Sequence, residues 1–145
     1  MGFYALTLEP DGEALLVRSR DFPEVVSFGE TREDALLHGR DAIEEAIAAR
    51  IAHREEIPAP SKSALGAHCV ELPVMVELKA ALYMTLRRRG LSRADLQRLM
   101  QLPHREQVDR LLRLDHNTHI ETVLQAFRAL GSPVEIRIPM PDAAA

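Results

Sequence analysis

Acidic side chains that could hold catalytic metal ions are frequent in the first 30 residues of the chain. They are Glu9, Asp11, Asp21, Glu24 and Glu30. A nuclease that works with two metal ions needs carboxylates that converge on cations about 4 Å apart. Glu9 and Asp11 flank a turn, and Asp21 and Glu24 share a loop, so no carboxylate pair is fixed across neighbouring strands. We therefore expect these acids to be solvated or to face a basic partner.

Other signatures of catalysis or metal binding are missing from the sequence. It has no Ser-His-Asp spacing, no P-loop and no glycine pattern of a dinucleotide-binding fold. His116 and His119 are not accompanied by a third and a fourth metal ligand, and His68 beside the single cysteine, Cys69, is typical of an ordinary strand. We expect no catalytic residue, no metal site and no cofactor, and therefore no enzyme.

Arginine and glutamine cluster in residues 90–112, GLSRADLQRLMQLPHREQVDRLL, where two amphipathic runs flank a short break. The outward residues are Ser92 and Arg93 in the first run and His104, Arg105, Gln107 and Arg110 in the second. Arg and Gln pair with guanine and adenine edges in the major groove, and helix N-termini favour phosphate. The pattern predicts a helix-turn-helix that binds DNA through these six residues. The alternative is a plain helical hairpin with solvated arginines, since Glu106 and Asp109 would repel phosphates.

The net charge of −4 conceals two halves of opposite sign. Residues 1–60 hold 13 Asp or Glu against 6 Lys or Arg, whereas residues 61–145 hold 9 against 12. Eight of the arginines and only 3 acids fall within residues 85–113. An acidic half joined to a basic half indicates two partners of opposite charge, although a chance fluctuation of the surface is the simpler alternative.

The compartment follows from what the chain lacks. A single cysteine excludes an internal disulfide and fits a reducing cytoplasm. No apolar run approaches the length of a membrane span, and the N-terminal MGFYALTLEP lacks the basic region of a signal peptide. We expect a cytoplasmic protein with no membrane partner.

The first 66 residues predict an antiparallel sheet covered by one long helix. Strands are expected over residues 3–8, 14–19 and 25–29, the first two joined by the turn EPDGE. The stretch TRED at residues 31–34 resembles a capping box, and apolar residues then recur every three or four positions to Ile51. EEIPAPSKSALGAH cannot continue this helix and reads as a connector.

Residues 67–145 predict a second, all-α domain, so we place the domain boundary near residue 66. HCVEL at residues 68–72 is a candidate strand that returns to the first sheet. Helices are expected over residues 73–89, from Ser92 to the break at Leu102-Pro103, over residues 104–113, and from Thr118 to Gly131. Leu99 is expected to face inward, and Thr118 with Glu121 to form a capping box.

The sequence VEIRI at residues 134–138 alternates apolar and charged side chains and predicts a half-buried C-terminal strand. Nothing nearby in the chain offers this strand a partner. One solution is that it pairs with its own copy in a dimer.

The chain resembles the HicB family of antitoxins over nearly its whole length. Gly29, Glu30, Thr31, Glu33, Asp34 and Ala35 are similar to the family's helix start, and IPAPS at residues 57–61 is similar to its connector. QVDRLL and HNTHIETVLQAFRALG resemble its helical domain. Two departures are the loop Phe22-Pro23-Glu24, which usually reads Leu-Pro-Gly, and the turn Gln101-Leu102-Pro103, which usually carries glycine.

The resemblance implies an α+β chain in two domains. Residues 1–66 would form a partial, inactive RNase H-like domain that masks a HicA-type toxin, a small mRNA-cleaving protein of double-stranded-RNA-binding fold. Residues 67–145 would form an XRE-like helix-turn-helix domain that binds its own operator as a dimer and represses transcription. We expect Asp21, Phe22, Pro23 and Glu24 to contact the toxin.

Two other functions stay open at this point. A stand-alone helix-turn-helix regulator, whose α/β domain senses a ligand or another protein, would explain the same elements. A nuclease would require metal-dependent cleavage of RNA–DNA hybrids that is lost in Asp21→Asn.

Overall fold

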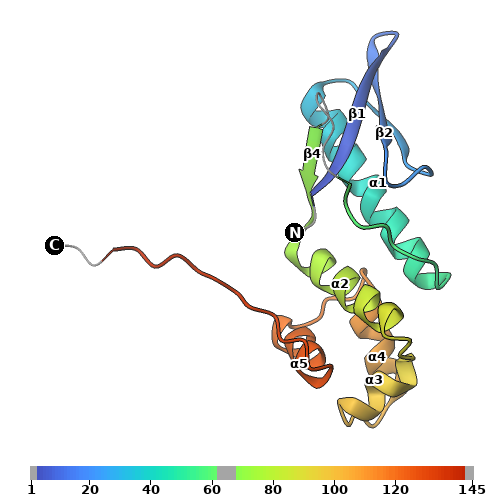
Figure 1. Ribbon diagram of the computed structural model, residues 1–145. Helices are drawn as coiled ribbons and strands as arrows, with labels where there is room; N and C mark the ends of the chain where they lie inside the picture. The colour runs from blue at the N-terminus through green and yellow to red at the C-terminus, as the bar shows by residue number, and fades with distance from the viewer. Residues whose placement is uncertain (1–2, 62–67, 143–145) are drawn as a thin grey trace.

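The computed structural model describes residues 3–61 and 68–142, and its N-terminal part is a four-stranded antiparallel sheet (Figure 1). The strands are β1 (Phe3–Asp11), β2 (Ala14–Ser19), β3 (Val26–Gly29) and β4 (His68–Glu71), in the order β3-β2-β1-β4. β1 and β2 form the predicted hairpin, with Leu8 opposite Val17. Gly12 lies in the turn at φ +63, a conformation that glycine adopts at little cost. The three strands expected before the helix are confirmed.

β4 joins the sheet from far along the chain. It pairs with β1, with Tyr4 opposite Val70 and Ala5 opposite Cys69. The expected return of residues 68–72 to the first sheet is therefore confirmed, and the sheet is complete only at Glu71. The domain boundary expected near residue 66 lies outside the described residues and stays a prediction.

One long helix, α1 (Arg32–Ala52), covers one face of the sheet. The hydroxyl of Thr31 accepts a hydrogen bond from the amide of Asp34 at 3.1 Å, so the predicted N-terminal cap is confirmed. The helix comes close to the sheet at Gly39, where an added Cβ would lie 2.6 Å from Leu6 Cδ1 and 2.8 Å from Val17 Cγ1. Glycine is therefore required here by packing rather than by its backbone conformation.

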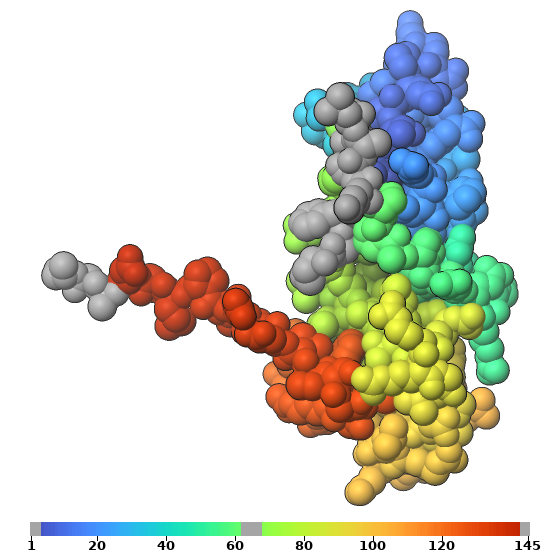
Figure 2. Space-filling model, in the orientation of Figure 1, coloured from blue at the N-terminus to red at the C-terminus, as the bar shows by residue number. Residues whose placement is uncertain are grey.

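Four helices follow the sheet and pack around a shared apolar core (Figure 1). They are α2 (Val74–Arg88), α3 (Arg93–Leu99), α4 (Arg105–Leu112) and α5 (Ile120–Ala129). Their buried side chains belong to the same hydrophobic cluster as those of the sheet. The Tyr83 hydroxyl on α2 also donates to the carbonyl of Glu55 at 2.6 Å, just beyond α1. Figure 2 shows the result, an elongated α+β molecule with the sheet at one end and α3 and α4 at the other.

Two expectations about helix faces and caps are wrong. Leu99 is 49 % exposed, because α3 ends there and its last turn projects into solvent. Thr118 does not cap α5, whose N-cap is His119. The Thr118 hydroxyl instead accepts a hydrogen bond from the buried ammonium of Lys79 at 2.8 Å.

The predicted C-terminal strand does not form within the single chain. Residues 132–142 have no regular secondary structure and run away from α5 as an extended segment (Figure 1). Ile136 and Ile138 are 53 % and 73 % exposed. A strand needs a neighbour for its backbone N–H and C=O groups, and the described chain supplies none here.

Candidate nucleic-acid interface and partner surface

The turn between α3 and α4 has the hydrogen bonds of a Schellman motif. The amide of Leu102 donates to the carbonyl of Gln97 at 3.0 Å, and the amide of Gln101 donates to that of Arg98 at 3.1 Å. Gln101 adopts the left-handed conformation, φ +55, in which glycine is usual. Pro103 prevents the helix from continuing. A tight turn with both Schellman hydrogen bonds therefore forms without glycine.

α4 presents most of the side chains predicted to contact DNA. His104, Arg105 and Arg110 are exposed, and Gln107 is half-buried. The side-chain oxygen of Gln107 accepts a hydrogen bond from the amide of His104 at 3.1 Å, which helps to cap the helix. Neither arginine side chain has an ion-pair partner among the described residues, so both guanidinium groups can bind a ligand.

Three of the six predicted residues line one hollow beside α4. Ser92, Arg93 and Arg105 surround a space of about 270 Å³ together with Arg54 and Arg87. Arg54 follows α1 and Arg87 belongs to α2, and the Arg87 guanidinium donates to the Arg54 carbonyl at 2.7 Å. The clustering of four arginines makes this hollow electropositive and suited to phosphate. Neither Arg54, which is distant in the chain, nor Arg87 was among the predicted contacts.

Gln107 and Arg110 lie on the other side of α4. They line a second hollow of about 190 Å³ with polar residues at the start of α5, among them Asn117 and His119. The structure therefore places the predicted residues around both sides of α4 rather than in one patch. Asn117 was not among the predicted contacts, because it lies outside the two runs of residues 90–112.

Two of the predicted DNA contacts also hold α3 in place. The Ser92 hydroxyl accepts from the amide of Asp95 at 3.0 Å, and the Asp95 carboxylate accepts from the amide of Ser92 at 2.7 Å. The Arg93 guanidinium lies 2.8 Å from the Asp109 carboxylate of α4. Arg93 thereby neutralises one of the two acids that argued against a DNA-binding surface.

Beneath α4 lies a buried ammonium group that sequence reasoning missed. Lys79 of α2 is fully buried. Its Nζ lies 2.7–3.1 Å from the carbonyl oxygens of Arg110, Arg113 and His116 and the hydroxyl oxygen of Thr118. Burial lowers the pKa of Lys79, and the negative charge of Asp115 opposes this shift. Lys79 satisfies carbonyls at the end of α4 and so fixes that helix. The sequence did contain a sign of this burial, because Lys79 lies among the apolar residues that α2 buries.

The loop expected to contact a partner is anchored by its aromatic residue. Phe22 is fully buried and packs edge-on against Tyr4, with ring centroids 5.0 Å apart. The Arg50 guanidinium of α1 lies 5.3 Å from the centre of the Phe22 ring. A partner could therefore reach the exposed Pro23 and Glu24, but not Phe22.

Both acids of this loop form hydrogen bonds within the chain. The Glu24 carboxylate accepts from Arg50 at 2.7 and 3.1 Å, which lowers the pKa of Glu24. The Asp21 carboxylate accepts from the amide of Ser61 at 3.2 and 3.3 Å. Glu24 replaces the glycine usual at its position, and its ion pair fastens the loop to α1. The loop is thus well ordered by these bonds.

An apolar surface that sequence reasoning missed adjoins this loop. Val26 and Phe28 on the edge strand β3 are 46 % and 50 % exposed. Phe28 lies opposite Leu16 in the sheet, on the face away from α1, because neighbouring residues of a strand point to opposite faces. Exposed large apolar side chains on a sheet edge are typical of protein interfaces.

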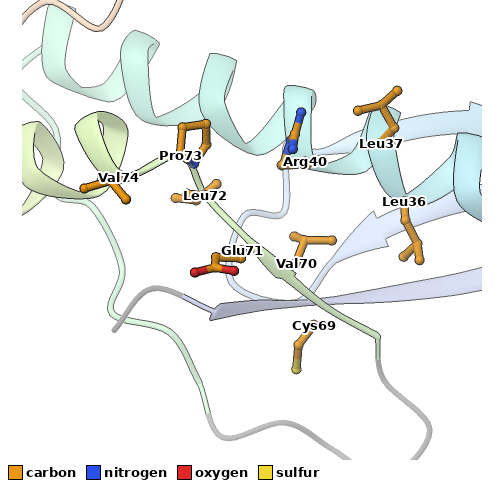
Figure 3. A pocket seen from close by; sticks show the side chains of 9 residues that line it. All are labelled: Leu36, Leu37, Arg40, Cys69, Val70, Glu71, Leu72, Pro73 and Val74. Carbon is orange, nitrogen blue, oxygen red and sulfur yellow. The ribbon is translucent and has the colours of Figure 1, made fainter. Parts of the chain in front are cut away.

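A shallow groove of about 710 Å³ runs between α1, β4 and the start of α2 (Figure 3). Leu37 and Val74 are exposed at its rim, and Arg40 of α1 is the only cation among the described residues that line it. Among these described lining residues, Glu71 is the single acid.

The described residues contain no cluster of three or more His, Cys, Asp or Glu that could hold a metal ion. None of the helices in residues 3–61 and 68–142 is both long and apolar enough to cross a membrane.

The sequence is similar to those of known proteins. Residues 3–81 match the family described as HicB_like antitoxin of bacterial toxin-antitoxin system. Antitoxin HicB 2 of Photorhabdus laumondii is 35 % identical over 92 % of this chain and 94 % of its own length. Antitoxin HicB of Pseudomonas fluorescens is 31 % identical over 93 % and 92 %, and that of Escherichia coli K12 is 31 % identical over 92 % and 96 %. The chain therefore belongs to the HicB family and is an antitoxin of a bacterial toxin–antitoxin system.

Proposed function

We propose that the sheet unit, made of β1–β4 and α1, masks a HicA-type mRNA-cleaving toxin. The helical unit, made of α2–α5, would bind the operator of its own operon as a repressing dimer. The protein would act in the cytoplasm without a cofactor and without catalysing a reaction. The α3–α4 pair would serve as a helix-turn-helix, with α4 in the major groove.

The observation that carries the DNA proposal is the pair of hollows on either side of α4, each lined by an exposed arginine of that helix. The major groove is about 12 Å wide and is bordered by a phosphate backbone on each side. A helix inserted there needs phosphate-binding groups on both flanks and base-reading groups at its exposed edge. Arg105 lies on one flank, Arg110 on the other, and His104 at the N-terminal end between them.

The DNA proposal is tested by titrating the promoter DNA of the operon with the full chain at fixed salt. Arg105→Ala and Arg110→Ala should each weaken binding by about 1–3 kcal/mol. Arg128→Ala on α5 is the matched control, because it removes an equally exposed arginine far from both hollows. Unchanged affinity in both α4 variants, with all chains folded, would reject α4 as the reading helix.

The toxin proposal is carried by the exposed Val26 and Phe28 beside the loop Asp21–Glu24, on an acidic unit. A basic RNA-cleaving partner would be attracted by this charge and held by the apolar residues. Residues 1–60 contain 13 acidic and 6 basic residues, so this part of the chain carries a net negative charge.

The toxin proposal is tested by co-expressing the tagged chain with the neighbouring open reading frame. A small basic protein, toxic when expressed alone, should co-purify with the wild-type chain. Val26→Asp with Phe28→Asp should abolish its capture, whereas Leu37→Asp in the groove of Figure 3 should not. DNA binding without any such protein would instead indicate a stand-alone regulator.

A further inference from the structure

The C-terminal segment carries a row of uncovered apolar side chains. Ile136, Ile138 and Met140 are largely exposed, and the segment projects away from the helices (Figure 2). Val134, at its start, packs against the hydrophobic core. Side chains of this kind do not stay in water when a complementary surface is present.

The sequence of this segment is nearly symmetric about one residue. From residue 133 to residue 139 it reads Pro-Val-Glu-Ile-Arg-Ile-Pro. Counted outward from Ile136, Glu135 mirrors Arg137, and Val134 mirrors Ile138. An antiparallel pair of identical strands centred on Ile136 would therefore bring each Glu135 opposite an Arg137 of the other copy. Opposite charges at directly facing positions stabilise an antiparallel pair.

We propose that residues 134–138 pair with the same residues of a second copy of this chain as a two-stranded antiparallel ribbon centred on Ile136. The flanking Pro133 and Pro139 lack the backbone N–H that a ladder needs, so they limit the ribbon to five residues at both ends. Their symmetric placement matches a ribbon whose two halves are identical.

The ribbon also accounts for the uncovered side chains. Val134, Ile136 and Ile138 share one face, because alternate residues of a strand point the same way. Glu135 and Arg137 share the other face, and already within one chain their side chains lie 2.9 Å apart. Ile138 of the second copy would lie opposite Val134, and so above the core against which Val134 packs. The apolar face of the ribbon would thus extend the core of both helical units.

This inference deepens the proposed operator-binding dimer and rests on it for its biological role, but its test needs neither DNA nor toxin. The dimer dissociation constant of the full chain is measured by sedimentation equilibrium. Glu135→Arg and Arg137→Glu should each weaken the dimer about tenfold or more, because like charges then face one another twice. Glu121→Arg on α5 makes the same change of charge outside the ribbon and should leave the dimer unchanged.

Combining the two charge changes should restore dimerisation. The double variant Glu135→Arg with Arg137→Glu restores both opposite-charge contacts and should dimerise like the wild-type chain. An equimolar mixture of the two single variants should form a heterodimer that is tighter than either homodimer. Single variants that dimerise as the wild-type chain does, or a mixture with no preference, would overturn the proposal.

Crosslinking fixes the register independently. In a Cys69→Ser background, Ile136→Cys would place two thiols face to face and should give a disulfide-linked dimer under mild oxidation. Ile138→Cys should not crosslink, because its two copies would be about 13 Å apart along the ribbon. Equal crosslinking of both variants would indicate a parallel pair and reject the register. Loss of operator binding in a chain that still crosslinks at Ile136 would count against the proposed function alone.

Discussion

Several side chains predicted to bind partners also hold the fold together. Arg93 pairs with Asp109, Gln107 caps α4, and Glu24 pairs with Arg50. Substitution of any of these would change stability and binding together. Arg105 and Arg110 have side chains without such ties among the described residues, so they separate binding from folding.

Substitution of Lys79 is expected to lower the stability of the fold. Lys79→Met should lower the free energy of unfolding by about 3 kcal/mol, because buried oxygen acceptors at the end of α4 would lose their donor. Thr118→Val removes a single acceptor and should cost about 1 kcal/mol. Urea unfolding followed by circular dichroism measures both. An unchanged midpoint in Lys79→Met would mean that other groups satisfy these carbonyls.

The ion pair between Glu24 and Arg50 predicts a dependence on acid. Arg50 holds the pKa of Glu24 below its usual value of 4.5 in the folded state. A carboxylate of this kind stabilises the fold above its unfolded pKa, and the contribution is lost as the pH falls through the folded pKa. Below pH 4.5 the wild-type chain should therefore lose stability more steeply than Glu24→Gln. The difference should stay within about 1 kcal/mol, because the pair is partly exposed.

Urea midpoints between neutral pH and pH 3 or so check this expectation. Glu13→Gln is the matched control, since Glu13 is exposed and has no ion-pair partner among the described residues. A profile of Glu24→Gln identical to that of the wild-type chain would contradict a contribution from this pair.

At the scale of elements, the turn after α3 shows how a helix can end without glycine. Gln101 occupies the left-handed region at φ +55, which costs an L-residue about 1 kcal/mol. Gln101→Gly should therefore stabilise the protein by roughly that amount without altering the turn. Gln125→Gly, in the middle of α5, makes the same exchange in a helical conformation and should destabilise by about 1 kcal/mol. A loss of stability in Gln101→Gly would show that its side chain contributes contacts that outweigh the strain.

Elements with local signals were predictable from the sequence, and those that depend on distant partners were not. The hairpin of β1 and β2, the Thr31 cap and the helix start at Ser92 involve residues close in the chain, and all are confirmed. The C-terminal strand was predicted from its alternation alone, but no partner lies within the chain. The candidate site shows the same division, because α4 was predicted while Arg54, which follows α1, and Lys79 of α2 come from parts of the chain far away in sequence.

At the scale of the whole molecule, one hydrophobic cluster joins the sheet unit to the helices. Tyr83 reinforces the junction through its hydrogen bond to Glu55, and α1 contacts α2. A shared core makes independent unfolding of the two units unfavourable. We therefore expect the sheet and the helices to unfold together.

The two tyrosines allow this cooperativity to be measured. Tyr4 lies in β1 and Tyr83 in α2, and the chain has no tryptophan. Tyr4→Phe leaves only Tyr83 as a fluorescent reporter, and Tyr83→Phe leaves only Tyr4. Within each variant, the urea transition seen by fluorescence should coincide with that seen by circular dichroism. A tyrosine signal that changes well before the circular dichroism would show that one unit unfolds separately.

The pairing of β1 with β4 has a consequence for synthesis on the ribosome. The first strand of the chain is a central strand, and one of its two neighbours is made only when residues 68–71 have been translated. Until then, one edge of the nascent β1 is open, and an open edge favours pairing with other chains. The toxin-binding unit proposed here would therefore become complete only after roughly half of the chain has been made, which delays neutralisation by each new antitoxin molecule.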